Sequence, residues 1–158
     1  MTDEPTPSLC TLSTSESVKA ELYALQREYA HLPQVEMPVH HVLHGGMYAR
    51  TIKIPAGVLL TGAHIKRATM LVISGHVTVF VGEGSIEFAG YQVLPASAGR
   101  KQAFLAHADT FVTMLFPSEA ASIEAAENEF TDEADRLLSR RQACESITIT
   151  GEPKCLEQ

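Results

Sequence analysis

The pattern of hydrophobic positions changes twice along the chain. Between Ser13 and Leu32, apolar residues recur at intervals of about 3.6 residues, which is typical of an amphipathic helix. From about His40 to Pro117 the period falls to roughly two, and turn residues recur every several positions, as they do between short β-strands. After Pro117 the pattern is helical again. The sequence therefore predicts a mainly β domain with a helical segment at each end.

The N-terminal helix has recognisable ends. Ser13 precedes Glu16 by the spacing of a capping box, and Pro33 predicts a stop near Leu32. A single amphipathic helix has to bury its apolar stripe. Packing on the outer face of the barrel and packing on a partner chain both remain open, and we favour the first. The stripe consists of Val18, Leu22, Leu25 and Tyr29.

Eight candidate strands follow one another in the β-domain. Short strands separated by turn residues favour a jelly-roll barrel or sandwich over an open sheet. In HVTVFV, Val77 and Val79 alternate with His76 and Thr78, so one side of this strand should face the core. The candidates are MYARTIKI, VLLTGAHI, TMLVI, HVTVFV, SIEFA, YQVLP, QAFLA and TFVTMLF.

The C-terminal region predicts two helical pieces and a strand. Ser118 is a plausible N-cap for the first piece, and Thr131 for the second, which carries acids early and arginines late, as the helix dipole favours. The two pieces could form one broken rod or two helices. The alternating SITIT near the end could add a strand to a sheet edge of this molecule or of a neighbour. The predicted divisions are an irregular leader (1–14), an N-terminal helix and linker (15–39), a β-barrel (40–117), a C-terminal helical segment (118–143) and a tail (144–158).

Length and charge restrict the classes of function. A chain of 158 residues supports one core. Its formal charge of −7 should repel phosphate backbones, so nucleic-acid binding is not expected. No apolar run approaches the ~20 residues of a membrane helix, and the acidic, polar start lacks the features of a secretory signal. These features, together with Cys10, Cys144 and Cys155 as expected free thiols, predict a soluble protein of the cytoplasm.

Two stretches carry a resemblance to a known family. Gly57 and Gly75 bracket a segment in which His64 follows GVLLTGA, and SGHVTV then leads into the next strand. This segment resembles the first motif of the cupin family, in which a small jelly-roll barrel presents G, five residues, H-x-H, three or four residues, E, six residues and G. The stretch GYQVLPASAGRKQAF resembles the second motif. The resemblance implies a cupin-like jelly-roll barrel or sandwich.

Most of the metal ligands that the family would supply are replaced. Lys66 stands in place of the second histidine, Ala68 or Thr69 in place of the glutamate, and Gln102 in place of the histidine of the second motif. A divalent transition metal needs about three or four imidazole, thiolate or carboxylate ligands, and an ammonium group opposes a dication. We therefore expect no metal or other cofactor. A displaced site remains open, and it would use His44, His64 and His107.

A closer resemblance covers about residues 40 to 130. It runs through HGGMYARTIKIPAGVLLTGAHIK, LVISGHVTV, PASAGRKQAFLAHADTFVTMLFP and the acidic helix SIEAAENEFTDEADRL. These stretches are similar to small uncharacterised cupin-like proteins encoded by tailed bacteriophages and prophages. The resemblance implies a barrel and a phage setting, in the host cytoplasm or in the virion, and no particular activity.

Several polar residues could form a ligand site at one mouth of the predicted barrel. The basic ones would suit a small anion such as a carboxylate, a phosphate or a nucleotide. A solvated loop position is the alternative for Arg100 and the favoured one for Lys101. The candidate ligand-binding residues are His64, Lys66, Arg100, Gln102, His107 and Asp109.

Three functions are consistent with these features. The first is a non-catalytic, phage-encoded binding protein that takes a small anion or a phage or host protein partner. The second is a structural component of the virion or its assembly that docks through its terminal extensions. The third is a metal-dependent cupin enzyme with a non-standard site. We favour the first because the predicted mouth is basic and has lost its metal ligands. An enzyme is the less favoured alternative, since no P-loop, nucleophile elbow or HExxH motif is present. The two apolar helical stripes also predict a homo-oligomer, a dimer or larger.

Overall fold

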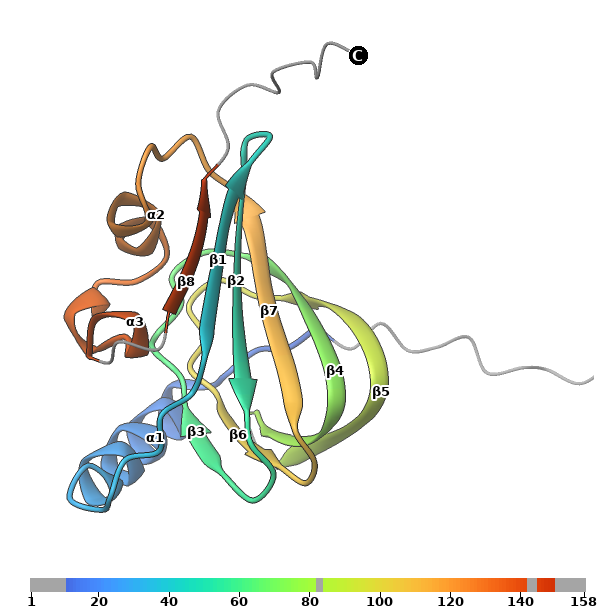
Figure 1. Ribbon diagram of the computed structural model, residues 1–158. Coiled ribbons are helices and arrows are strands. Elements are labelled where there is room, and N and C mark those ends of the chain that lie inside the picture. Colours follow the sequence, from blue (N-terminus) through green and yellow to red (C-terminus); the bar gives the residue numbers. More distant parts are fainter. Residues whose placement is uncertain (1–10, 82–83, 142–144, 150–158) are drawn as a thin grey trace, which may run out of the picture.

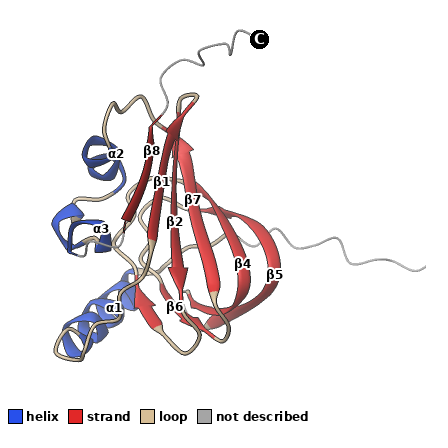
Figure 2. Cartoon of the chain, viewed as in Figure 1, coloured by secondary structure: helices blue, strands red, loops and turns tan. Residues whose placement is uncertain are grey.

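The computed structural model describes residues 11–81, 84–141 and 145–149. A strongly curled sheet dominates the molecule, and the helices gather on one side of it (Figures 1 and 2). The prediction of a mainly β fold with helices at both ends is confirmed. In chain order the elements are α1 (Glu16–Tyr29), β1 (Val39–His44), β2 (Met47–Ile54), β3 (Leu59–Thr61), β4 (Thr69–Phe80), β5 (Ser85–Ala96), β6 (Ala103–Ala106), β7 (Thr110–Pro117), α2 (Ile123–Phe130), η1 (Ala134–Arg136), α3 (Leu138–Arg141) and β8 (Glu145–Ile149).

The sheet runs in the order β3-β6-β4-β7-β2-β1-β8, and β5 pairs with β4. The curl comes from β4, which has different neighbours along its length. Its first half pairs with β7 and its second half with β6, while β5 follows it throughout. The strand must therefore bend between the two partners, and Figure 1 shows β4 strongly curved. Gly75, with a positive φ, lies between the two pairing stretches.

Two of the expected turns are bends inside long strands. The sequence predicts separate strands on either side of Gly75 and on either side of Gly90, whereas β4 and β5 continue through both positions. The two glycines pair with each other across the ladder and both have positive φ. They let a long hairpin curve as a unit, which the sequence pattern could not distinguish from a chain reversal.

The core follows the predicted alternation. In β4, Leu71, Ile73, Val77 and Val79 point inward and are buried, as expected for the two valines. His76 lies on the outer face of the same strand. The inward residues of β2 and β7 complete an apolar interior that α2 covers through Phe130. The interior of the curl is therefore a place where apolar strand faces and a helix meet.

The N-terminal helix packs on the barrel of its own chain. Ser15 rather than Ser13 caps α1, because its side chain accepts a hydrogen bond from the backbone N–H of Val18. Leu22 is buried, and the Tyr23 hydroxyl donates to Glu133 at 2.6 Å. The helix α1 therefore contacts the C-terminal segment. How the residues before position 11 continue lies outside the described residues.

The C-terminal helical segment is broken into three pieces. Ser122 rather than Ser118 caps α2, and Thr131 leaves the helix in an extended conformation. Leu137 is also extended, so η1 and α3 are separate short turns. Among the described residues, no helix has the length and apolar character needed to cross a membrane. The three cysteines lie outside the described residues.

The strand predicted at SITIT exists in this chain as β8. It pairs with β1 in parallel and forms one end of the sheet order. β1 itself was not expected, because in VHHVLH the histidines stand at positions 40, 41 and 44 and hide the alternation of a strand. Val39, His41 and Leu43 nevertheless point inward and are buried.

Candidate functional site

The curled sheet encloses a cavity of about 90 Å³. Inward side chains from β2, β4, β6 and β7 form its wall, and Phe130 of α2 adds to it. Among the residues that line the cavity, only Arg50, Arg100 and Gln102 have polar side chains. A mostly apolar pocket with a few polar groups is the usual composition of a small-molecule site.

Gln102, one of the residues that line this cavity, has a hydrogen-bond donor without a partner among the described residues. Its side chain is buried, and its Nε2 has no hydrogen-bond partner within the described part of the chain. A buried amide donor without an acceptor destabilises the folded protein by about 1–3 kcal/mol. The position therefore suits an acceptor atom from outside the protein.

Arg100 brings a buried positive charge. Its guanidinium donates to the carbonyl oxygens of Ser97 and Arg67 at 3.0 and 3.2 Å, and to Thr69 Oγ1 at 2.8 Å. These acceptors are uncharged, and no ion pair of Arg100 occurs within residues 11–81, 84–141 and 145–149. Burial lowers the pKa of Arg100 to about 10, so the group stays protonated at neutral pH.

Arg50 is also buried, but its charge is balanced. Its Nη1 lies 2.9 Å from Glu127 Oε2, and both side chains are almost fully enclosed. Arg140 Nε donates to the other oxygen of Glu127 at 3.0 Å, and the Ser139 hydroxyl also donates to the carboxylate. The guanidinium of Arg50 stands 5.8 Å from the centroid of the Phe130 ring. This pair joins β2 to α2 and closes one side of the cavity.

Lys101 is fully buried, so the expectation of a solvated loop position is wrong. Its Nζ donates to Gln26 Oε1 and to the carbonyl oxygen of Gly62, both at 2.7 Å, and lies 4.3 Å from the Tyr23 ring centroid. Burial lowers the pKa of Lys101. Burial, followed by the hydrogen bond to Glu133, raises the pKa of Tyr23 to about 12. The expectation was wrong because α1, which is distant in sequence, covers Lys101, whereas the residues next to Lys101 in the sequence suggest an exposed loop.

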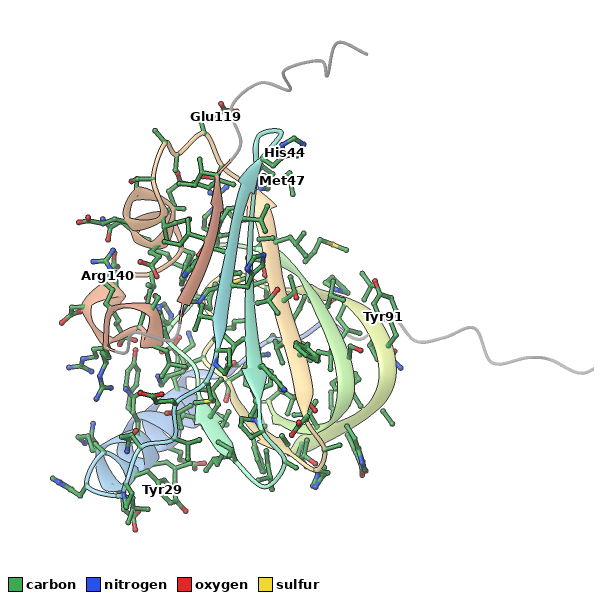
Figure 3. All side chains as sticks on the ribbon, in the orientation of Figure 1. Tyr29, His44, Met47, Tyr91, Glu119 and Arg140 are labelled. Atoms are coloured by element: carbon green, nitrogen blue, oxygen red, sulfur yellow. The ribbon has the colours of Figure 1, made fainter. Side chains whose placement is uncertain are left out.

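A groove of about 350 Å³ lies outside the cavity. It runs between the end of α1, the linker that follows, β3 and the short C-terminal helices. Ile52, Leu60, Gly62 and Ala63 line both the groove and the cavity, so these residues form the wall between them. Tyr29, labelled in Figure 3 at the end of α1, lies at the outer end of the groove, and Arg136 and Arg141 also line it.

The six predicted ligand-binding residues do not form one cluster. Arg100 and Gln102 line the cavity. Lys66 extends outward and pairs with Asp132 at 2.7 Å, both largely exposed, and hydrogen bonding to Lys66 lowers the pKa of Asp132. The backbone N–H of His64 donates to Glu133 Oε2 at 3.2 Å.

His107 and Asp109 lie in the loop between β6 and β7. The imidazole of His107 hydrogen-bonds the Thr78 hydroxyl at 2.7 Å, and Asp109 accepts from the backbone N–H of Ala56 at 3.0 Å. Neither residue lines the cavity or the groove. The six residues therefore lie in three places rather than at one shared mouth: the cavity, the contacts with Asp132 and Glu133, and the β6–β7 loop.

The structure does not bring the residues of a displaced metal site together. His44 lies at the β1–β2 hairpin, labelled at the tip of the sheet in Figure 3, whereas His107 lies near Thr110, which pairs with the other end of β2. The eight residues of β2 span about 25 Å at about 3.3 Å per residue, which is too far for two ligands of one ion. His107 instead lies beside His76 and Glu87, two residues that the sequence pattern did not single out.

Comparison with known proteins gives structural matches only. No family model matches the sequence, and no curated protein does. One solved structure is a cupin superfamily protein from Desulfitobacterium hafniense, with 9% identity and a TM-score of 0.46 over 56% of this chain and 84% of that chain. A conserved protein of unknown function from Streptococcus pyogenes gives 16% identity and a TM-score of 0.45 over 56% and 80%. KdgF from Halomonas sp. gives 17% identity and 0.45 over 55% and 84%.

These likenesses cover little more than half of the chain, at low identity and at TM-scores below 0.5. The architecture itself is clear from the strand order and register of this chain. The protein has a mainly β fold, in which a curled and mostly antiparallel sheet carries helices at both ends.

Proposed function

We propose that this protein is a non-catalytic binding protein that takes up a small organic anion with an apolar body, such as a monocarboxylate. The observation that carries the proposal is Gln102, a residue of the mostly apolar cavity lining whose buried Nε2 has no acceptor in the described chain. A carboxylate oxygen is an acceptor of the kind this amide lacks.

The charges around the cavity support an anion rather than a neutral ligand. Arg100 lines the cavity, is buried and donates only to uncharged oxygens among the described residues. A buried cation is unfavourable unless a negative charge compensates it. An anion near Gln102 would supply that charge. Arg50 adds little to the attraction, because Glu127 already balances it.

The size of the two spaces supports an elongated ligand. The cavity of about 90 Å³ is smaller than the ~150 Å³ cavity that holds a benzene molecule, so it has room for a head group alone. The groove of about 350 Å³ falls in the range of roughly 300–1,000 Å³ that is usual for ligand pockets. Leu60 and Ala63 line both spaces. A ligand that passes from one space to the other at these residues would place its charged group in the cavity and its apolar body in the groove.

Isothermal titration with hexanoate and hexanol tests this proposal, because the two ligands share an apolar body and differ in charge. We expect hexanoate to bind and hexanol to bind at least tenfold more weakly. Gln102→Met should weaken hexanoate by about tenfold, the effect of about 1.4 kcal/mol from one lost hydrogen bond to a charged acceptor. Gln92→Met on β5, outside the cavity lining, serves as the matched control and should leave the affinity unchanged.

Three results would contradict the proposal: equal binding of hexanol, unchanged binding by Gln102→Met, or no binding of hexanoate. Native mass spectrometry of the protein as purified adds a direct check. A retained organic acid would identify the natural ligand class, and Gln102→Met should lose it whereas Gln92→Met should keep it.

A protein partner is the second candidate, supported by an apolar patch on the outer face of the sheet. Met70, Tyr91, Val93 and Phe111 expose large apolar side chains there, and Tyr91 points away from the helices (Figure 3). Ser74 pairs with both Tyr91 and Phe111, so the patch is continuous across β5, β4 and β7. Such patches commonly mark interfaces.

We propose that a second copy of this chain covers this patch, which would account for the expected homo-oligomer. Light scattering on the eluting protein should give a dimer or larger species, and Tyr91→Ser should reduce it to a monomer. Tyr29→Ser, at an exposed tyrosine of α1, is the control. A monomeric wild-type protein would contradict this interface. The phage setting and an accessory or host-interaction role are part of the same proposal, and they rest on the sequence resemblance alone.

A further inference from the structure

A second cluster of functional side chains lies on the outer face of the barrel, away from the cavity. It consists of His76 on β4, Glu87 on β5 and His107 in the loop after β6. One ligand-type atom from each residue lies within 4.8 Å of the other two. The His76 and His107 rings are 4.7 Å apart between centroids, and the His76 imidazole already hydrogen-bonds the Glu87 carboxylate. We propose that this cluster is a binding site for a divalent transition-metal ion.

The register of the β4–β5 hairpin places the first two residues. Thr78 pairs with Glu87, and His76 pairs with Ala89, so His76 and Glu87 are diagonal neighbours on one face of the ladder. Val77 and Phe88 point to the opposite face and are buried in the core. The two ligand-type side chains are therefore held on the outside by the burial of their neighbours.

The backbone around His76 places the third residue. The backbone N–H of His107 donates to the carbonyl oxygen of His76 at 2.8 Å, and the Thr110 hydroxyl accepts from the N–H of His76 at 3.1 Å. The loop that carries His107 is thus fastened to the residue whose imidazole it meets. The Thr78 hydroxyl also hydrogen-bonds His107 Nε2 at 2.7 Å, which orients the ring.

Gly75 makes this close approach possible. A Cβ at position 75 would lie 2.5 Å from Thr110 Oγ1 and 2.8 Å from the carbonyl oxygen of Asp109. Only a glycine lets the loop between β6 and β7 press against β4 at this point, and its φ of +144° also favours glycine. The position that bends the strand is therefore the one that brings His107 to His76.

The donor set fits a specific class of ion. Two imidazoles with one carboxylate suit zinc, cobalt, nickel or iron in the divalent state, whereas Mg²⁺ and Ca²⁺ prefer oxygen ligands. In a tetrahedral zinc site with bonds of about 2.0–2.1 Å, ligand atoms are about 3.3 Å apart. The observed limit of 4.8 Å requires the side chains to move inward by about 1.5 Å, which His107 and Glu87 can do because both are exposed. Three protein ligands leave at least one position for water or an outside group.

Zinc titration of the full-length, chelator-treated protein tests this site. We expect about one equivalent of Zn²⁺ to bind with 1:1 stoichiometry. His76→Gln, Glu87→Gln and His107→Gln should each weaken zinc binding by at least tenfold. Loss of a residue that only hydrogen-bonds a metal ligand already weakens binding by about 10–100-fold, and loss of a ligand itself should cost no less. Their melting temperatures without zinc should stay close to that of the wild type, since the side chains of the cluster are solvent-exposed or partly so.

His44→Gln and His64→Gln are the matched controls, since both histidines lie outside the cluster and should leave zinc affinity unchanged. Co²⁺ absorption adds a readout of ligand type: the expected spectrum lacks the near-ultraviolet charge-transfer band of a thiolate. The proposal is overturned if the wild-type protein binds no zinc, if any cluster variant binds like the wild type, or if the cobalt spectrum shows a thiolate ligand. None of these outcomes depends on hexanoate binding, so the two proposals stand or fall separately.

Discussion

Glu127→Gln should destabilise the protein far more than a surface substitution does. The side chain of Glu127 is 3% exposed and that of its partner Arg50 is 5% exposed. The amide keeps the shape and removes the charge, so Arg50 remains buried without a counter-ion. Breaking a buried pair in this way costs about 3–5 kcal/mol. For a chain of this size, each kcal/mol lowers the melting temperature by about 2–4 °C, so the expected fall is about 10 °C.

Urea unfolding followed by circular dichroism measures the loss of free energy. Glu129→Gln is the matched control, because it makes the same chemical change on the same helix. Its partner is Arg67, and their side chains are 33% and 37% exposed, so solvent screening should limit that loss to about 1 kcal/mol. The double substitution Arg50→Met with Glu127→Leu should recover most of the stability, since it removes both charges. Equal losses in the two single variants would refute the argument that burial decides the cost.

Three further predictions concern single residues of the fold. Burial, followed by the charge of Arg50, lowers the pKa of His41 to about 4. Below pH 6.5 the unfolded chain therefore binds a proton that the folded protein does not, and the free energy of unfolding should fall by up to about 1.4 kcal/mol per pH unit as the pH drops towards 4. Urea unfolding across this range should show that slope, and His41→Phe should flatten it. Gly75→Ala should destabilise by about 2–4 kcal/mol, while Gly90→Ala, with open space around it, should cost about 1 kcal/mol; similar values for both would contradict the clash with the β6–β7 loop. Gln102→Met should raise the stability of the ligand-free protein by about 1–2 kcal/mol in the same assay, and a loss would show that the amide has an acceptor inside the fold.

The local parts of the fold were predictable because they depend on neighbouring residues. Alternation in HVTVFV correctly placed Val77 and Val79 in the core, and SITIT correctly predicted a strand. Errors arose where two local signals have the same appearance. A glycine that bends a strand resembles a glycine in a turn, so Gly75 and Gly90 led to four predicted strands where two exist.

The candidate site was less predictable because it depends on contacts between distant segments. Gln102 could be singled out from its position in a motif. The burial of Lys101 could not, since Gln26 and Tyr23 approach it from a helix about 75 residues earlier in the chain. His76 and Glu87 lack the close spacing of a metal motif and meet only through the hairpin register. That register could have been predicted from the sequence if Gly82, Glu83 and Gly84 had been taken as the centre of one long hairpin.

The pairing of β8 with β1 has a consequence for the order of events during synthesis. β1 is among the first strands to leave the ribosome, and β8 follows about 100 residues later. At about 5–20 residues per second, the open edge of β1 waits on the order of 5–20 seconds for its parallel neighbour. During that interval a nascent chain on an adjacent ribosome could pair with the same edge.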